Sequence, residues 1–215
     1  MPRQHPVLVL RDFNTSVQQS LNLAAAARQW ISPAQGPRHP KFTMAHQAML
    51  MELAYLKSFL AWESFLEESF VLYLWGKKTP RRYAPKRYVI PTTREYAIAL
   101  TLPEGRHYTD WDNPEVVLNR ARRFFVNGEP YENVLRTHIN LFQSLQVIRN
   151  AIVHRSTSSQ ARFEFLVRNE LGAFPSSLSV GRFLGMAQPS SSPPVSFLEH
   201  YLTQILGSAQ QIVPV

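Results

Sequence analysis

The longest apolar region of the chain, residues 43–75, constrains the fold more than any other feature. Thr43 at its start can act as a helix N-cap, and Gly76 follows directly after its end. Between them, one mostly apolar helix face is traced by Leu50, Leu53, Ala54, Lys57, Leu60, Ala61, Ser64 and Phe65. We therefore expect a helix over 43–75, and we expect it to be the longest of the fold.

This helix carries more aromatic rings than one buried stripe can hold. The rings are those of Tyr55, Phe59, Trp62, Phe65, Phe70, Tyr73 and Trp75. We expect either that some of them contact another chain or that the helix breaks in two. The same region contains Glu52, Lys57, Glu63, Glu67 and Glu68, which excludes a membrane span because a bilayer-crossing helix needs a predominantly apolar stretch.

Other end signals predict an all-α fold. Asp112-Asn113-Pro114-Glu115 supplies a capping side chain, a proline for the first turn and an acid for the positive helix end. Further helices are expected over 13–31, 113–126, 131–155, 160–171 and 194–210, with loops over 33–41 and 173–194. Residues 76–112, with four prolines, are expected to form an irregular basic insertion, in which 88–90 and 96–100 are either short strands or a broken helix.

The composition favours an anionic partner. The formal net charge is +8 and the pI is near 10, so nucleic acid is the first candidate and an anionic membrane surface the second. The absence of cysteine excludes disulfides, thiolate zinc sites and thiol nucleophiles. The apolar run Val7–Leu10 is too short for a signal peptide and is followed by Arg11 and Asp12, so we expect a soluble cytoplasmic protein.

The stretch Arg149-Asn150-Ala151-Ile152-Val153-His154 carries the strongest chemical signal. It places a cation, an amide and an imidazole within two turns of an otherwise apolar run. In a helix, Asn150 and His154 lie one turn apart on the same face, and the long side chain of Arg149 can reach the same cleft. The three side chains suit phosphate chemistry, because Arg clamps phosphate oxygens and His transfers protons near neutral pH. The alternative is structural, since cations also favour a helix C-terminus, where His can bond a last-turn carbonyl.

Arg149-Asn150 followed by His154 resembles the signature of the HEPN superfamily, small all-helical domains that include many metal-independent ribonucleases. Ala61–Glu67 is similar to the early long helix of the RiboL-PSP and abortive-infection groups, and Ser179–Leu184 to the way such domains end. The resemblance covers about 42–207. It implies a single HEPN-like domain over 1–215, with the helix at 13–31 as an extension.

The resemblance also implies a reaction. The ribose 2′-hydroxyl would attack the phosphate, with His154 as general acid or base, Arg149 neutralising the phosphorane and Asn150 orienting the scissile group. No metal or cofactor would be needed. Because one histidine cannot easily serve both sides of the phosphorus, two copies are expected to pair across one cleft. The biological role implied is that of a toxin or antiviral abortive-infection effector, with an antitoxin or operon-neighbour protein as partner. A tyrosine that related toxins carry two residues after the histidine is replaced by Ser156, which puts control through that residue in doubt.

A basic segment provides the second candidate site. Lys77, Lys78, Arg81, Arg82, Lys86 and Arg87 occur with no acid before Glu95, and Tyr83 and Tyr88 lie among them. They predict a strip that binds RNA phosphates and stacks unpaired bases, extended by Arg120, Arg122 and Arg123. The alternative is a solvated loop that aids solubility.

The long helix carries the carboxylates Glu63, Glu67 and Glu68, and Glu63 and Glu67 share a face that could form a paired-acid site. The favoured interpretation is that the three are surface groups or partners of arginines, Arg149 among them, and a Glu63 that pairs with Arg149 would orient it. The other histidines show no metal-ligand spacing. Two further hypotheses remain beside the ribonuclease: a non-catalytic HEPN-type module that binds RNA or protein, and a helical adaptor that binds an acidic protein only.

Overall fold

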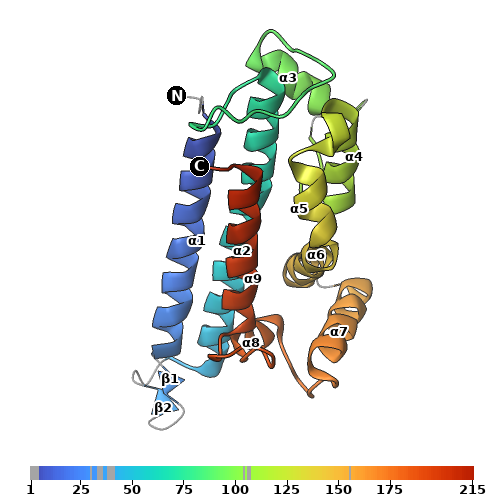
Figure 1. Ribbon diagram of the computed structural model, residues 1–215. Helices are drawn as coiled ribbons and strands as arrows, with labels where there is room; N and C mark the ends of the chain where they lie inside the picture. The colour runs from blue at the N-terminus through green and yellow to red at the C-terminus, as the bar shows by residue number, and fades with distance from the viewer. Residues whose placement is uncertain are drawn as a thin grey trace. The chain divides into compact units, whose positions relative to one another are not determined.

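Helices make up most of the computed structural model, which describes residues 5–29, 31–32, 36–37, 42–103, 105, 108–154 and 156–215 (Figure 1). The helices of the described chain are α1 Pro6–Gln29, α2 Met44–Trp75, α3 Arg94–Thr101, α4 Pro114–Phe124, η1 Val126–Gly128, α5 Tyr131–Thr137, α6 Ile139–Val153, α7 Thr157–Leu171, α8 Val180–Gly185 and α9 Phe197–Ile212. Two short strands, β1 Ile31–Ser32 and β2 Gly36–Pro37, pair antiparallel. The expected all-α class is confirmed.

The chain divides into two compact units. The first unit consists of Met1–Thr15, Ala61–Gln143 and Ile205–Val215, and the second unit of Ser16–Leu60 and Ser144–Gln204. Helices α1, α2, α6 and α9 contribute residues to both. Each unit is described by itself below, and the expectation of a single HEPN-like domain over 1–215 stays a prediction.

The core of the first unit is aromatic and centres on Phe70 of α2. Its ring lies 4.9 Å from that of Phe125, 5.2 Å from Tyr131 and 5.3 Å from Trp111. The Tyr131 hydroxyl lies 3.0 Å from the hydroxyl of Ser69, which satisfies both buried polar groups. Helices α4 and α5 lie against each other beside this core (Figure 1).

The aromatic residues of α2 pack within the chain itself, which corrects the expectation of a break or a partner chain. Helix α2 runs unbroken from Met44 to Trp75, and every one of these rings except Trp75 is at most 3% exposed. In the first unit, Trp62 stacks on Phe142 with ring centroids 5.3 Å apart and packs on Phe13 at 5.8 Å. The rings are accommodated because they contact several helices on several sides, so α2 is a central helix and not a surface helix with one apolar stripe.

The core of the second unit centres on Phe183 of α8. Its ring lies 4.3 Å from that of Phe197 at the start of α9 and 5.7 Å from that of Phe163 of α7. Tyr55 of α2 donates from its hydroxyl to the Leu145 carbonyl of α6 at 2.6 Å. This bond fixes α6, the helix of the Arg149–His154 stretch, to α2.

For the segment 76–112, the sequence left two conformations open, short strands or a broken helix, and the structure decides between them. Residues 96–100 belong to α3, whose N-cap Thr93 accepts a hydrogen bond from the Tyr96 N–H. Residues 88–90 form no strand, and Arg87 makes an isolated antiparallel bridge with Phe125. The expected irregular insertion is therefore confirmed around α3, for the residues that are described here.

Several helix limits differ from those predicted. Helix α1 starts at Pro6 and not at residue 13, because proline fits the first helical turn. The helix expected over 131–155 is two helices, separated at His138, whose backbone leaves the helical region (φ −112°, ψ 27°). Helix α4 ends at Phe124, and Asn127 adopts a left-handed conformation (φ 57°).

The expected loop over 173–194 contains the short helix α8. Ser179 caps it by accepting a hydrogen bond from the Arg182 N–H, and the core residue Phe183 anchors it. Most of the loop expected over 33–41, and Arg155 at the expected end of the motif helix, lie outside the described residues. Among the helices that are described, none is both long and apolar enough to cross a membrane.

Candidate active site

The Arg149–His154 stretch forms the last turns of α6, in the second unit. Phe142, Leu145 and Ile148 are at most 3% exposed and anchor the helix by one face. The His154 N–H donates to the Asn150 carbonyl at 2.8 Å, so His154 completes the last helical turn although α6 ends at Val153. Helix α7 starts anew at Thr157, after the N-cap Ser156. The three predicted residues thus lie at the junction between two helices.

The structure brings the side chains of the three residues together. Nη1 of Arg149 donates to Oδ1 of Asn150 at 3.0 Å and lies 3.3 Å from Nε2 of His154. The expected reach of Arg149 back toward His154 is therefore present. Since a guanidinium is always a donor, Nε2 of His154 is the acceptor in this contact. Nε2 can accept this bond in the tautomer that carries the ring proton on Nδ1.

His154 is exposed at the helix end, beside Val153, which is 48% exposed. A purely structural histidine would be expected to lie against apolar neighbours with its nitrogens bonded to the backbone. Here the ring instead contacts the guanidinium of Arg149, whose described partners, Asn150 and His154, include no carboxylate. The positive charge of Arg149 is therefore oriented by these two residues without being neutralised by them.

A pocket of about 700 Å³ adjoins the motif within the second unit. Its walls come from α2, α6, α7 and the segment that leads into α8, and they consist of Glu52, Ala151, Ile152, Ser156, Thr157, Gln160, Ala161, Glu164, Leu178, Ser179 and Val180. Sequence reasoning missed the polar residues of these walls. The spacing of Gln160 and Glu164 on one helix face was a weak signal, whereas nothing in the sequence linked Glu52 to residues a hundred positions later.

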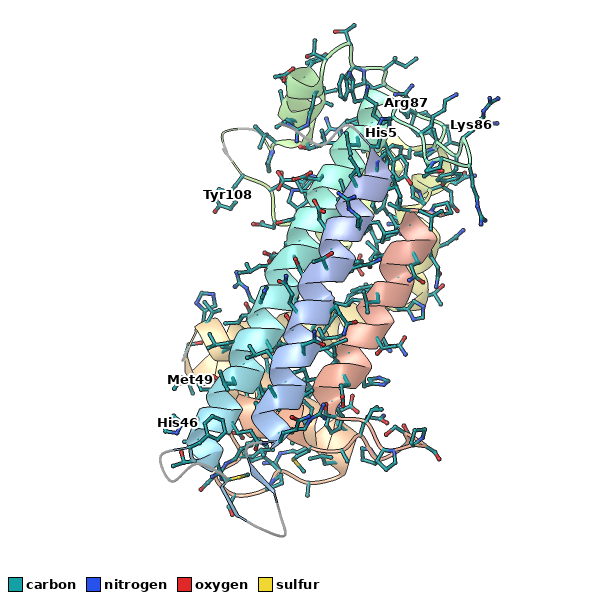
Figure 2. All side chains as sticks on the ribbon, turned by 90° about the vertical axis from the view of Figure 1, so that its left-hand side faces the viewer. His5, His46, Met49, Lys86, Arg87 and Tyr108 are labelled. Atoms are coloured by element: carbon teal, nitrogen blue, oxygen red, sulfur yellow. The ribbon has the colours of Figure 1, made fainter. Side chains whose placement is uncertain are left out.

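The basic segment belongs to the first unit, and its residues take two roles. Lys78, Arg81, Arg82 and Lys86 are exposed. Arg87 donates to the Leu74 carbonyl at 2.8 Å and thereby binds the end of α2, and the Lys77 ammonium lies 3.8 Å above the Trp75 ring. Figure 2 shows Lys86 projecting from the loop next to Arg87. The exposed cations, with Tyr88 at 62% exposure, form the part of the predicted strip that is open to a ligand.

The arginines of α4 are mostly engaged within the protein. Arg120 donates to the Thr101 carbonyl at 3.0 Å. Arg122 holds both carboxylate oxygens of Glu132, at 2.8 and 2.6 Å, and Arg123 is exposed. Arg123 alone of the three is thus both exposed and without a hydrogen bond among the contacts described here.

The predicted pairing of Glu63 with Arg149 stays a prediction, because Glu63 belongs to the first unit and Arg149 to the second. Ser156 accepts a hydrogen bond from the Ser159 N–H at 3.2 Å and caps α7. No group of three potential metal ligands occurs among the residues that the structure describes.

Comparisons with known proteins add no relative: no family, no curated protein and no solved structure matches this chain.

Proposed function

We propose that the protein is a metal-independent endoribonuclease that cleaves RNA at the Arg149–His154 site. One observation carries the proposal: at a helix end, an exposed imidazole lies in contact with a guanidinium whose hydrogen-bond partners, among the residues that the structure describes, include no carboxylate. A general base and a cation for a phosphate are thus side by side. The resemblance of Arg149, Asn150 and His154 to the HEPN signature supports the same reaction.

The reaction needs only groups of the RNA and of the protein. Nε2 of His154 takes the proton of the ribose 2′-hydroxyl while the 2′-oxygen forms a bond to phosphorus. Arg149 neutralises the charge that develops on the non-bridging oxygens. The bond from phosphorus to the 5′-oxygen then breaks, and that oxygen takes up a proton. The products are a 2′,3′-cyclic phosphate and a 5′-hydroxyl end.

The contact between Arg149 and His154 gives the site a resting state. At 3.3 Å, the Arg149 Nη1 occupies the lone pair that the base needs. A phosphate is a stronger partner for a guanidinium than a neutral imidazole, because both the charge and the two-donor geometry match. Substrate binding would therefore move Arg149 to the phosphate, and Nε2 of His154 would become free to accept a proton.

The proton for the 5′-oxygen must come from the opposite side of the phosphorus, and the proposal assigns it to His154 of a second copy. Apolar residues suited to such pairing are exposed on the second-unit part of α2. Met49, Leu53 and Leu60 recur at the spacing of one side of the helix, and each is at least 50% exposed. Figure 2 shows the position of Met49 on α2. Leu53 directly follows Glu52, which lies in the wall of the pocket. Pairing of two copies through these apolar residues would therefore occur close to the site.

The proposed biological role is that of a cytoplasmic toxin or antiviral abortive-infection effector whose partners are RNA, a second copy and an antitoxin or operon-neighbour protein. It follows from the HEPN resemblance. The exposed basic strip around Lys78 and Lys86 supports RNA as the partner, since cations beside an exposed tyrosine suit an unpaired strand. The same strip favours the second candidate, a non-catalytic HEPN-type module that binds RNA without cutting it.

The test is RNA cleavage in EDTA by the wild type, Arg149→Ala and His154→Ala, with identification of the product ends. We expect cyclic phosphate ends from the wild type and a loss of at least about 100-fold in each variant. Arg162→Ala and His200→Ala are matched controls, because these residues lie in the second unit outside the motif and the pocket. If the wild type binds RNA but cuts no member of a broad panel, the binding module is the better description.

A further inference from the structure

The pocket of the second unit lies where an RNA strand held at the motif would place a base. Ala151 and Ile152 belong to both the motif stretch and the pocket wall, and Ser156 follows His154 by two residues. Ile152 lies one turn after Arg149 on the same side of α6. A nucleotide whose phosphate contacts Arg149 would therefore lie close to this pocket.

The walls of the pocket combine an apolar surface with hydrogen-bond acceptors. Ala151, Ile152, Ala161, Leu178 and Val180 give the flat face of a base something to pack on. The charged residues among the described walls are the carboxylates Glu52 and Glu164, and none of these wall residues is Lys or Arg. Such a recess disfavours a phosphate and favours a group that donates hydrogen bonds.

The two carboxylates are held differently. Oε1 of Glu52 accepts a hydrogen bond from the Gly181 N–H at 2.9 Å, so this side chain also fixes the start of α8. Gly181 packs so closely on the backbone of Ala48 that a Cβ would overlap it. Glu164 has a weak neighbour in Gln160, whose Nε2 lies 3.5 Å from Oε1. Glu164 is therefore the carboxylate that can turn to a ligand without loss of a strong bond.

We propose that this pocket binds a guanine base of the RNA and that Glu164 recognises it. Guanine presents two adjacent donors, N1–H and the 2-amino group, which match the two oxygens of one carboxylate. Adenine and cytosine place a ring acceptor next to their amino group, and uracil flanks its N–H with two carbonyls. An acceptor that faces a carboxylate is repelled, so the other three bases fit less well.

The size of the pocket agrees with the binding of a guanine base. A volume of about 700 Å³ falls within the roughly 300–1,000 Å³ that is usual for ligand pockets. Ser156, Thr157 and Gln160 on the rim are exposed, so a base can enter while its strand stays outside. The inference rests on the proposed function, because it identifies the RNA sequence that the Arg149–His154 site would meet.

The experiment measures binding without cleavage. Fluorescence anisotropy in EDTA would compare pentamers of 2′-deoxyuridine that carry a central deoxyguanosine, deoxyadenosine, deoxycytidine or deoxyinosine. These probes have no 2′-hydroxyl, so the proposed reaction cannot consume them. We expect the deoxyguanosine pentamer to bind about 10-fold more tightly than the others. Deoxyinosine lacks the 2-amino group and should lose most of that advantage.

Glu164→Gln should bring the deoxyguanosine pentamer to the affinity of the others, and Glu164→Asp, which withdraws the carboxylate by one methylene, should weaken the preference. Glu170→Gln on the same helix, outside the pocket, is the matched control and should keep it. Thermal melting would establish that each variant is folded. The Asp variant provides the test should the Gln variant not fold.

The outcomes separate this inference from the proposed function. Equal binding of all probes by the wild type, or no binding of any, overturns the guanine pocket even if RNA is cut in EDTA. A preference for guanine that survives Glu164→Gln overturns the role of Glu164. A preference that depends on Glu164, in a protein that cuts no RNA, supports the pocket and contradicts the nuclease.

Discussion

Two arginines of the second unit show how differently one side chain can be used. Arg28 of α1 holds the Glu199 carboxylate through two bonds of 2.7 and 2.5 Å, and Ser196 donates to the same carboxylate from its N–H and its hydroxyl, both at 2.8 Å. Arg149 contacts the amide of Asn150 and the imidazole of His154. The first guanidinium is neutralised by a carboxylate, whereas the described partners of the second include no carboxylate.

The difference indicates which arginine a phosphate can recruit. Removing Arg28 from its partner would leave a carboxylate that is 29% exposed without its counter-charge, so the pair is costly to open. Opening the Arg149 contacts leaves behind an amide and an exposed imidazole, and no carboxylate loses its counter-charge. In this unit, therefore, the chemical nature of the partner distinguishes an arginine that stabilises the fold from one that is available to a substrate.

The largest effect on RNA cleavage should follow from replacing the planar guanidinium of Arg149 by an ammonium group. Arg149→Lys keeps the charge but loses the planar pair of donors, so kcat/KM for RNA should fall at least about 10-fold while the melting temperature stays that of the wild type. Arg162→Lys in the same unit is the control. Full activity of Arg149→Lys would mean that charge alone is needed, and the bidentate clamp would be wrong.

The converse substitution is Arg28→Ala, which should affect stability and not cleavage. The pair is about one third exposed, so after allowance for solvent screening we expect a loss of about 1–2 kcal/mol in the free energy of unfolding. Urea unfolding measures this loss, and the RNA cleavage assay should be unchanged at a temperature where the variant is folded. Loss of cleavage in folded Arg28→Ala would contradict the separation of the two roles.

The same pair should make the stability of the protein depend on pH in the acid range. The hydrogen bond from Arg28 is the main cause that lowers the pKa of Glu199 from its ordinary 4.5 to about 2. Because the folded state has the lower pKa, the stabilisation is complete above pH 4.5 and is lost as the pH falls from 4.5 through 2. Unfolding by urea across this range should show a smaller pH dependence in Arg28→Ala, and an identical dependence in both proteins would assign it to other carboxylates.

The features that depend on residues close together in the chain could be predicted from the sequence. Thr43 and Gly76 gave the limits of α2, and Asn113 the start of α4, because capping depends on neighbouring residues. The break at His138 was missed, since no glycine or proline marks it. Arg149 and His154 were predicted to meet because the long side chain of Arg149 can reach round the helix to a residue less than two turns away. The convergence of Glu52 and Glu164 on their pocket, like the pairing of Arg28 with Glu199, depends on the packing of distant helices and leaves no signal in one sequence.

The smallest effect on stability is expected at Arg122 of the first unit. This arginine separates the hydrogen-bond geometry of an ion pair from the exposure of the pair to solvent. Its two bonds to Glu132, of 2.8 and 2.6 Å, are as short as those of Arg28 to Glu199, but the Arg122 side chain is 41% exposed and Arg136 provides a second cation near the same carboxylate. Arg122→Ala should leave the urea midpoint unchanged at 0.5 M salt, because water and ions replace an exposed partner. A destabilisation as large as that of Arg28→Ala would show that two-bond geometry, and not the environment of the pair, decides what an arginine contributes.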